Sequence, residues 1–274
     1  MKLLQINNLL VGTVCSILLA ACSPKIAPPL PADLSTEVLT EAEGLAKEGN
    51  PPAPGFNAAG SDAKAIAIAD EVMQAMGGRK AWDGARYLSW DFFGHRKLLW
   101  DKHAGLCRIE WTKRPQKIIV NLHDGTGKVS LNGIEQTHPD SLAKYLAIGK
   151  KVWINDSYWL VMPFKLKDSG VTLKYLGDSK TEAAEAADLL QMTFASVGVT
   201  PDNKYHVWVD KKARLVTQWA YFEKFGDEKP QITNPWNGYK RCGKILLSPE
   251  RGSRGSLDPV EVLETVPMGV FERF

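Results

Sequence analysis

The chain has 274 residues, of which 44% are hydrophobic and 24% are charged, the composition of a folded protein with one large or two ordinary domains. Lysine and arginine number 34 against 31 aspartate and glutamate, a formal net charge of +3. So small and dispersed an excess excludes the basic footprint of a nucleic-acid-binding protein, and we expect no nucleic-acid partner.

The first 21 residues have the pattern of a bacterial lipoprotein signal peptide. Lys2 supplies a positive charge, and the apolar run Leu9 to Leu19 has the length of a signal-peptide core but is too short to span a membrane. Leu19-Ala20-Ala21-Cys22 then matches the lipobox of such signals, in which the cysteine thiol receives a diacylglycerol. We therefore predict a lipid anchor at Cys22, the alternative being an ordinary secretory signal with a chance cysteine.

A lipid anchor holds a protein on a membrane without spanning it. Ser23 rather than an aspartate follows the cysteine, which by resemblance to the usual enterobacterial sorting rule favours the outer membrane, and no acidic surface-export run follows. We predict an outer-membrane location, with the protein facing the periplasm.

Residues 22–60 are rich in Pro, Ala and Glu, including Pro28-Pro29-Leu30-Pro31 and Pro51-Pro52-Ala53-Pro54. Such a composition cannot bury enough apolar surface to fold, and its prolines keep it extended. We expect a tether over 22–60, a folded domain over 61–252 and a C-terminal extension over 253–274.

Two cysteines remain once Cys15 leaves with the signal peptide and Cys22 is acylated. Cys107 and Cys242 can form a disulfide in an oxidising compartment, or they can be two separately buried thiols. The sequence leaves both alternatives open.

The folded domain is predicted to open with an amphipathic helix. Ser61 or Asp62 is a plausible N-cap, and Gly77-Gly78 ends the segment. Between them, apolar residues recur at helical spacing. They are Ile66, Ala69, Val72, Met73 and Met76.

Beyond this helix the hydrophobic period shortens toward two, which predicts an antiparallel meander. The stretches RYLSWDFFGHRKLLW, GLCRIEWT, KIIVNLHDG and GKVSLNGIEQT are short, aromatic and β-branched, and turn residues separate them. Asp124-Gly125 and Asn132-Gly133 are tight-turn candidates because glycine tolerates positive φ.

A helical interlude is predicted from about Pro139 to Lys151, with a second short helix from about Asn155 or Ser157 to Val161. Asn155-Asp156-Ser157 offers an N-cap, and Pro163 removes an amide that a continuing helix would need. The stretch NDSYWLVMPFKL, residues 155–166, is then a candidate lid over the mouth of a curved sheet.

Strands resume after the interlude in VTLKYLGD, DLLQMTFAS, KYHVWVDKKARLVTQWAYFEKFG and GKILLSPERG. The third stretch predicts a hairpin, because Tyr205, Val207 and Val209 alternate before its turn and Trp219 and Tyr221 alternate after it. Eight to eleven strands with two or three helices make an α+β fold, whose large antiparallel sheet must curl to hide its apolar face.

Sites of catalysis or metal binding are not indicated by any motif. The five histidines show no HxxxH or HExxH spacing, and His103 with Cys107 lacks a second ligand pair. No nucleophile elbow or phosphate loop is present, since DGTGK at 124–128 is better explained as a turn. We expect no enzyme activity, no metal and no cofactor.

Aromatic residues are the unusual feature. Large rings on a concave sheet can fill a core, line an apolar cavity or stack on sugars. The nine tryptophans are Trp82, Trp90, Trp100, Trp111, Trp153, Trp159, Trp208, Trp219 and Trp236.

The order of these elements resembles the lipoprotein-localisation carrier (LolA/LolB-like) superfamily. ADEVMQAMGGRKAWDGARYLSWDF, SYWLVMPFKLKDSGVTLKYLG and the W-x-x-M-P-F-x-L segment are most similar to Gram-negative proteins labelled outer-membrane lipoprotein-sorting proteins, over roughly Asp62 to Gly252. The resemblance implies a half-open β-barrel with two or three helices covering its hollow, acyl chains as ligand, a lipoprotein as a partner, and no catalysis.

Three hypotheses follow. The first is a membrane-anchored protein that binds a lipid or acyl chain in an apolar hollow. The second is a structural, glycan-binding or protein-binding lipoprotein with a filled barrel and an exposed aromatic patch, and the third and least supported is a hydrolase. For the first, the candidate ligand-binding residues are Trp90, Trp111, Val161, Met162 and Phe164.

Overall fold

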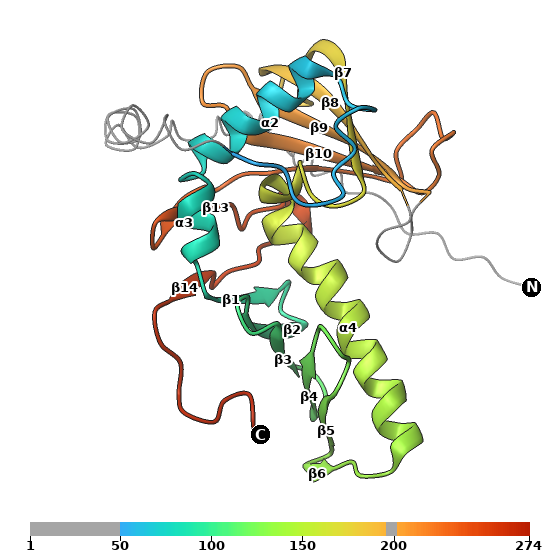
Figure 1. The fold of residues 1–274 in the computed structure, drawn as a ribbon, viewed down its shortest axis with the longest axis vertical. Helices are drawn as coiled ribbons and strands as arrows, with labels where there is room; N and C mark the ends of the chain where they lie inside the picture. Colours follow the sequence, from blue (N-terminus) through green and yellow to red (C-terminus); the bar gives the residue numbers. More distant parts are fainter. Residues whose placement is uncertain (1–49, 196–201) are drawn as a thin grey trace, which may run out of the picture.

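The structure is a computed structural model that describes residues 50–195 and 202–274, so the predicted signal peptide, Cys22 and the first part of the tether lie outside the described residues. The described part is α+β, with large antiparallel sheets and a long helix packed on one of them (Figure 1). Its helices are α2 (Ala63–Ala75), α3 (Arg79–Gly84), α4 (Pro139–Val161) and the 3-10 helices η1 (Met162–Lys165) and η2 (Gly252–Arg254).

The strands form two large sheets and a short ribbon, all antiparallel. In chain order they are β1 (Tyr87–Phe92), β2 (Arg96–Asp101), β3 (Leu106–Trp111), β4 (Gln116–Asn121), β5 (Gly127–Leu131), β6 (Ile134–Glu135), β7 (Val171–Lys180), β8 (Ala186–Phe194), β9 (Lys204–Asp210), β10 (Val216–Phe222), β11 (Ile232–Pro235), β12 (Lys240–Cys242), β13 (Ile245–Leu247) and β14 (Glu261–Leu263). These fourteen exceed the eight to eleven expected, because several predicted stretches contain a tight turn and a second strand.

The first sheet has the order β14-β1-β2-β3-β4-β5-β6 and is the predicted meander. In β1 every second side chain is buried, as alternation requires of a sheet with one face on the core. Asn132 and Gly133 both have positive φ in the turn between β5 and β6, as predicted for this pair.

The N-terminal helix is confirmed, with one difference at its start. Asp62 occupies the N-cap position but makes no capping bond, because its carboxylate accepts the Tyr175 amide at 2.9 Å and the Lys174 ammonium at 3.0 Å. At the other end, Gly77 has φ 114°, and a Cβ there would lie 2.4 Å from the carbonyl oxygen of Lys244. The helix therefore stops where only glycine fits, and its first residue is tied to β7.

The interlude is a single 23-residue helix, α4, and the prediction of a separate short helix beginning near Ser157 was wrong. Asn155, Asp156 and Ser157 lie inside the helix. Asp156 is fully buried and accepts two hydrogen bonds from the Arg96 guanidinium, at 2.7 and 3.0 Å. Aspartate favours helix N-caps, but here Asp156 instead forms an ion pair with Arg96, which is distant in the sequence. Pro163 does end the α-helix, as expected, and lies in η1.

The second sheet has the order β11-β10-β9-β8-β7 and contains the predicted hairpin, β9 and β10. Figure 1 shows α4 extending from the first sheet to the second, with α2 alongside the second sheet. Backbone pairing keeps the two sheets separate, so no single curved sheet joins all the strands of the described residues.

Both ends of the described chain are docked on the domain. The last part of the expected tether is not extended into solvent: the Ala53 amide donates to the Lys167 carbonyl and the Asn57 amide to the Val171 carbonyl, each at 3.0 Å. Beyond Gly252, in the expected extension, β14 pairs with β1 as an edge strand.

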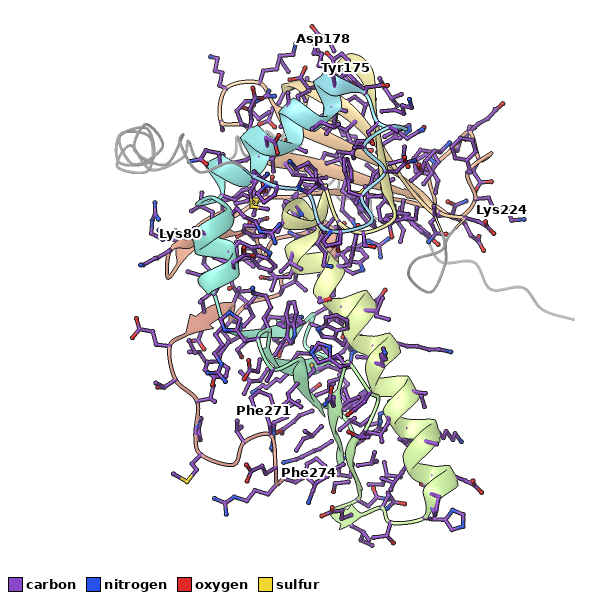
Figure 2. The ribbon with its side chains drawn as sticks, viewed as in Figure 1. Lys80, Tyr175, Asp178, Lys224, Phe271 and Phe274 are labelled. Carbon is purple, nitrogen blue, oxygen red and sulfur yellow. The ribbon has the colours of Figure 1, made fainter. Side chains whose placement is uncertain are left out.

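The last residues continue along the first sheet (Figure 2). The guanidinium of Arg108 in β3 donates to the carbonyl oxygens of Val270 and Arg273, at 2.8 and 2.6 Å. Cys107, the neighbour of that arginine, and Cys242 are both buried free thiols, so the alternative of two separate cysteines is the one observed.

Candidate ligand-binding cavity

A cavity of about 430 Å³ lies between the C-terminal half of α4 and the second sheet. Its volume is within the range of small-molecule binding sites. The described residues that line it are Lys151, Ile154, Asn155, Tyr158, Trp159, Met162, Phe194, Asn203, Tyr205, Trp219, Tyr221, Ile232 and Trp236.

The strand register gathers the rings of the sheet wall on one face. Tyr205 of β9 is directly opposite Tyr221 of β10, and Trp219 is two residues before Tyr221, on the same face. This is the face that alternation in the hairpin predicted. Phe194, at the end of β8, extends the aromatic surface next to Tyr205, with ring centroids 5.1 Å apart.

Two rings of α4 meet this wall. Trp159 packs edge-on against Trp219 with centroids 5.1 Å apart, and Tyr158 lies 5.7 Å from Tyr205. Edge-to-face and tilted pairs of this kind are favourable arrangements of aromatic rings. The rings thus hold the helix and the sheet apart and fix the shape of the cavity.

The phenols in the cavity are neutral. Burial raises the pKa of Tyr205 to about 12, and burial also raises the pKa of Tyr158 and Tyr221 above the ordinary value of a phenol. Tyr158 donates its hydroxyl to the sulfur of Met192 at 3.6 Å. The described lining residues include no Ser, Cys, His, Asp or Glu.

Two indole groups of the cavity lining have no hydrogen-bond partner. The Nε1 atoms of Trp219 and Trp236 are buried and donate to no acceptor in the described part of the chain. Trp236 also carries a cation on its ring, since the guanidinium carbon of Arg251 lies 3.5 Å from the ring centroid.

The predicted ligand-binding residues do not lie together. Met162 lines the cavity, whereas Trp90 and Val161 are fully packed in the core and Trp111 is half-buried with the guanidinium of Arg114 over its ring. Phe164 instead lines a smaller pocket of about 110 Å³, where it stacks on Trp82 with centroids 4.3 Å apart.

That smaller pocket is polar rather than apolar. Its basic residues are already in ion pairs, Arg79 with Asp83, Lys165 with Asp168 and Lys167 with Asp70. These pairs leave it no uncompensated charge with which to attract a ligand. The larger cavity is therefore the candidate site.

The rim of the large cavity is connected to the first sheet by a buried polar link. The Asn155 amide donates to the Asp156 carboxylate at 2.9 Å, and Asp156 is paired with Arg96 of β2. Burial raises the pKa of Asp156 above its usual value, although Arg96 and Asn155 oppose that shift. The pair fixes the rotation of α4 and with it the rings that face the cavity.

Comparison with known proteins gives structural matches only. No protein-family model matches the chain, and no curated protein sequence matches it. Solved structures do: a domain provisionally named an outer membrane lipoprotein-sorting protein from Vibrio parahaemolyticus (9% identity, TM-score 0.39, 76% of this chain and 96% of that one), a DUF1329 family protein from Desulfovibrio piger (14%, 0.42, 76% and 97%) and a LolA superfamily protein from Nitrosomonas europaea (10%, 0.40, 76% and 97%).

All three matches are under 25% identical, and one of them is named as a LolA superfamily protein, the superfamily that the sequence resembles. Their TM-scores are below 0.5, so we infer nothing about the ligand from them and rely on the cavity. Among the described helices, none combines the length and hydrophobicity needed to cross a membrane.

Proposed function

We propose that this protein is a lipid-anchored, non-catalytic protein of the outer membrane that faces the periplasm and binds the acyl chain of a lipid or lipoprotein. The observation that carries the proposal is the 430 Å³ aromatic cavity between α4 and the second sheet. Transfer of lipids or lipoproteins to the outer membrane is the role that such binding would serve.

The surface of the cavity suits an apolar chain. Ile154, Met162 and Ile232 add aliphatic groups to the seven aromatic rings, and each methylene that leaves water contributes about 0.8 kcal/mol. The ring contacts already exist without ligand, so little ordering is needed on binding. In this proposal the second sheet and α4 form the hollow of a half-open barrel.

The second hypothesis, an exposed aromatic docking patch, has no specific observation in its favour. The large hydrophobic side chains that are exposed among the described residues are Ile134, Leu176, Phe225, Met268 and Phe274. None of them is a tryptophan, and apart from Met268 and Phe274, which share the C-terminal stretch after β14, they lie on different segments.

The first test uses the ligand that the protein carries. Full-length protein extracted from membranes is examined by native mass spectrometry for bound lipid, and its uptake of a fluorescent acyl probe is titrated. We expect a co-purified acyl lipid or saturable uptake; the absence of both would contradict the proposal.

A matched pair of variants locates the binding. Ile232→Trp places an indole into the cavity wall, whereas Ile134→Trp makes the same change at a 68% exposed position in β6 of the first sheet. Ile232→Trp should weaken probe uptake about tenfold or more, and Ile134→Trp should leave it unchanged. Equal effects of the two variants would place the probe elsewhere.

A further inference from the structure

The formal charge of the described cavity lining is positive. Lys151 is the only formally charged residue among the described lining residues. It is exposed at the rim, on the first turn of α4 that faces the second sheet, and it forms no ion pair with any described residue. A ligand would therefore meet one free ammonium at the entrance and no carboxylate within.

A second cation lies behind the aromatic wall. Arg251 is fully buried against Trp236, and its guanidinium donates to the Ser248 hydroxyl at 3.1 Å, to the Glu250 carbonyl at 2.7 Å and to the Trp159 carbonyl. None of these acceptors is a carboxylate, and Nε has no acceptor in the described part of the chain. Burial lowers the pKa of Arg251 to about 9, so the group is still a cation at neutral pH.

Two tryptophans of the cavity lining have hydrogen-bond donors without an acceptor. The unpartnered Nε1 groups of Trp219 and Trp236 can only donate. Buried donors of native proteins nearly always find an acceptor in protein, water or ligand. Both residues line the cavity, but their Nε1 atoms are buried rather than exposed to it, so the selectivity for the head group depends on the charges of Lys151 and Arg251.

We propose that the cavity selects amphiphiles with an anionic oxygen head group, a carboxylate or a phosphate, over cationic ones. This inference rests on the proposed function. The head group binds Lys151 at the rim, where it stays hydrated, and the chain lies among the rings. A cationic head group would meet the fields of Lys151 and Arg251, whereas the carboxylates that act on the lining phenols, Asp168 on Tyr158 and Glu223 and Asp227 on Tyr221, lie outside the described lining.

A preference for cationic head groups would also have a physical basis, so the two outcomes of a test can be told apart. Aromatic rings alone attract quaternary ammonium groups through their quadrupoles. Here one ring, that of Trp236, already has a guanidinium on it. The inference is that the two protein cations outweigh the remaining rings.

Competition against a neutral probe measures this selectivity. The full-length chain is loaded with N-phenyl-1-naphthylamine at pH 7.5 and titrated with dodecanoate, dodecyl phosphate, dodecanol and dodecyltrimethylammonium, each below its micelle concentration. Both anions should displace the probe at concentrations about tenfold lower than the cation. Equal or stronger displacement by the cation would overturn the inference. Whichever anion is the stronger competitor distinguishes a fatty acid from a phosphate-bearing lipid.

Two glutamine variants on α4 test the position of the head group. Lys151→Gln should raise the dodecanoate concentration needed by about three- to fivefold and leave dodecanol unchanged. Lys144→Gln removes the same charge two turns earlier, outside the cavity lining, and should change neither. If dodecanoate is unaffected by Lys151→Gln, the inference fails while the proposed function stands. If the neutral probe does not bind and no amphiphile competes, the proposed function itself fails.

Discussion

The two halves of α4 pack against two sheets in different ways. Its first half touches the first sheet so closely that a Cβ on Gly149 would lie 2.8 Å from a methyl carbon of Ile118. Its second half presents Tyr158 and Trp159, whose rings meet the second sheet edge-on and leave a cavity of about 430 Å³. The first half of α4 is therefore closely packed on its sheet, whereas the second half borders a cavity. The difference follows from the size of the side chains that each half presents.

The packed core of the first sheet and the cavity wall of the second sheet should differ most in the effect of removing a buried tryptophan. Trp90→Ala removes an indole that is packed on all sides and should lower the free energy of unfolding by about 4 to 5 kcal/mol. Trp219→Ala removes a ring that already borders empty space, and should cost about 2 kcal/mol less. Urea denaturation of both variants measures the loss of unfolding free energy. Equal losses would mean that the surroundings of Trp90 and Trp219 are packed alike.

The ion pair between the two halves should come next in size. Arg96→Ala leaves the carboxylate of Asp156 buried without its partner, which should cost about 3 kcal/mol at pH 7. Arg79→Ala breaks the exposed pair with Asp83 and should cost less than about 1 kcal/mol. A loss no larger than that of the Arg79 control would show that the Arg96 pair does not hold the helix in place.

A single added methyl group at Gly149 tests how closely the first half of α4 packs on the first sheet. Gly149→Ala gains helix propensity but pushes against Ile118, a stiff β-branched side chain, so we expect a net loss of about 1 to 2 kcal/mol. Gly84→Ala in α3 meets nothing within 4 Å and should be neutral or slightly stabilising. If Gly149→Ala were stabilising in thermal denaturation, the contact between α4 and β4 would be looser than described.

The smallest effect concerns pH. Burial raises the pKa of Asp156, so the folded protein binds this proton more readily than the unfolded chain does. The free energy of unfolding of the wild type, relative to Asp156→Asn, should therefore fall as pH rises from the unfolded pKa of about 3.9 through the folded one. Denaturation curves between pH 4 and 7 test the sign, and a rise with pH would mean that Arg96 dominates over burial.

Much of the fold follows from local sequence, and the hairpin is the clearest case. Alternation placed Tyr205, Trp219 and Tyr221 on one face, and the structure confirms that face. The end of α4 could not be read in this way, because the role of Asp156 depends on Arg96, 60 residues away.

The residues of the cavity could also be predicted only in part from local sequence. Trp90 and Val161 were nominated for their apolar bulk, but bulk does not tell a packed side chain from one that borders a hollow. The alternation of the hairpin, combined with Trp159 of the W-x-x-M-P-F-x-L segment, would have nominated the rings that face the cavity. Whether such rings close on one another or stay apart depends on how far the helix lies from the sheet, which no local pattern encodes.

A crystal structure of the protein soaked with 12-bromododecanoate would show directly whether an acyl chain binds in the cavity. We expect an anomalous bromine peak inside the cavity among Trp159, Tyr205 and Trp219, with the carboxylate near Lys151. Ordered bromine only at other sites, with the cavity empty under saturating ligand, would contradict the proposed function.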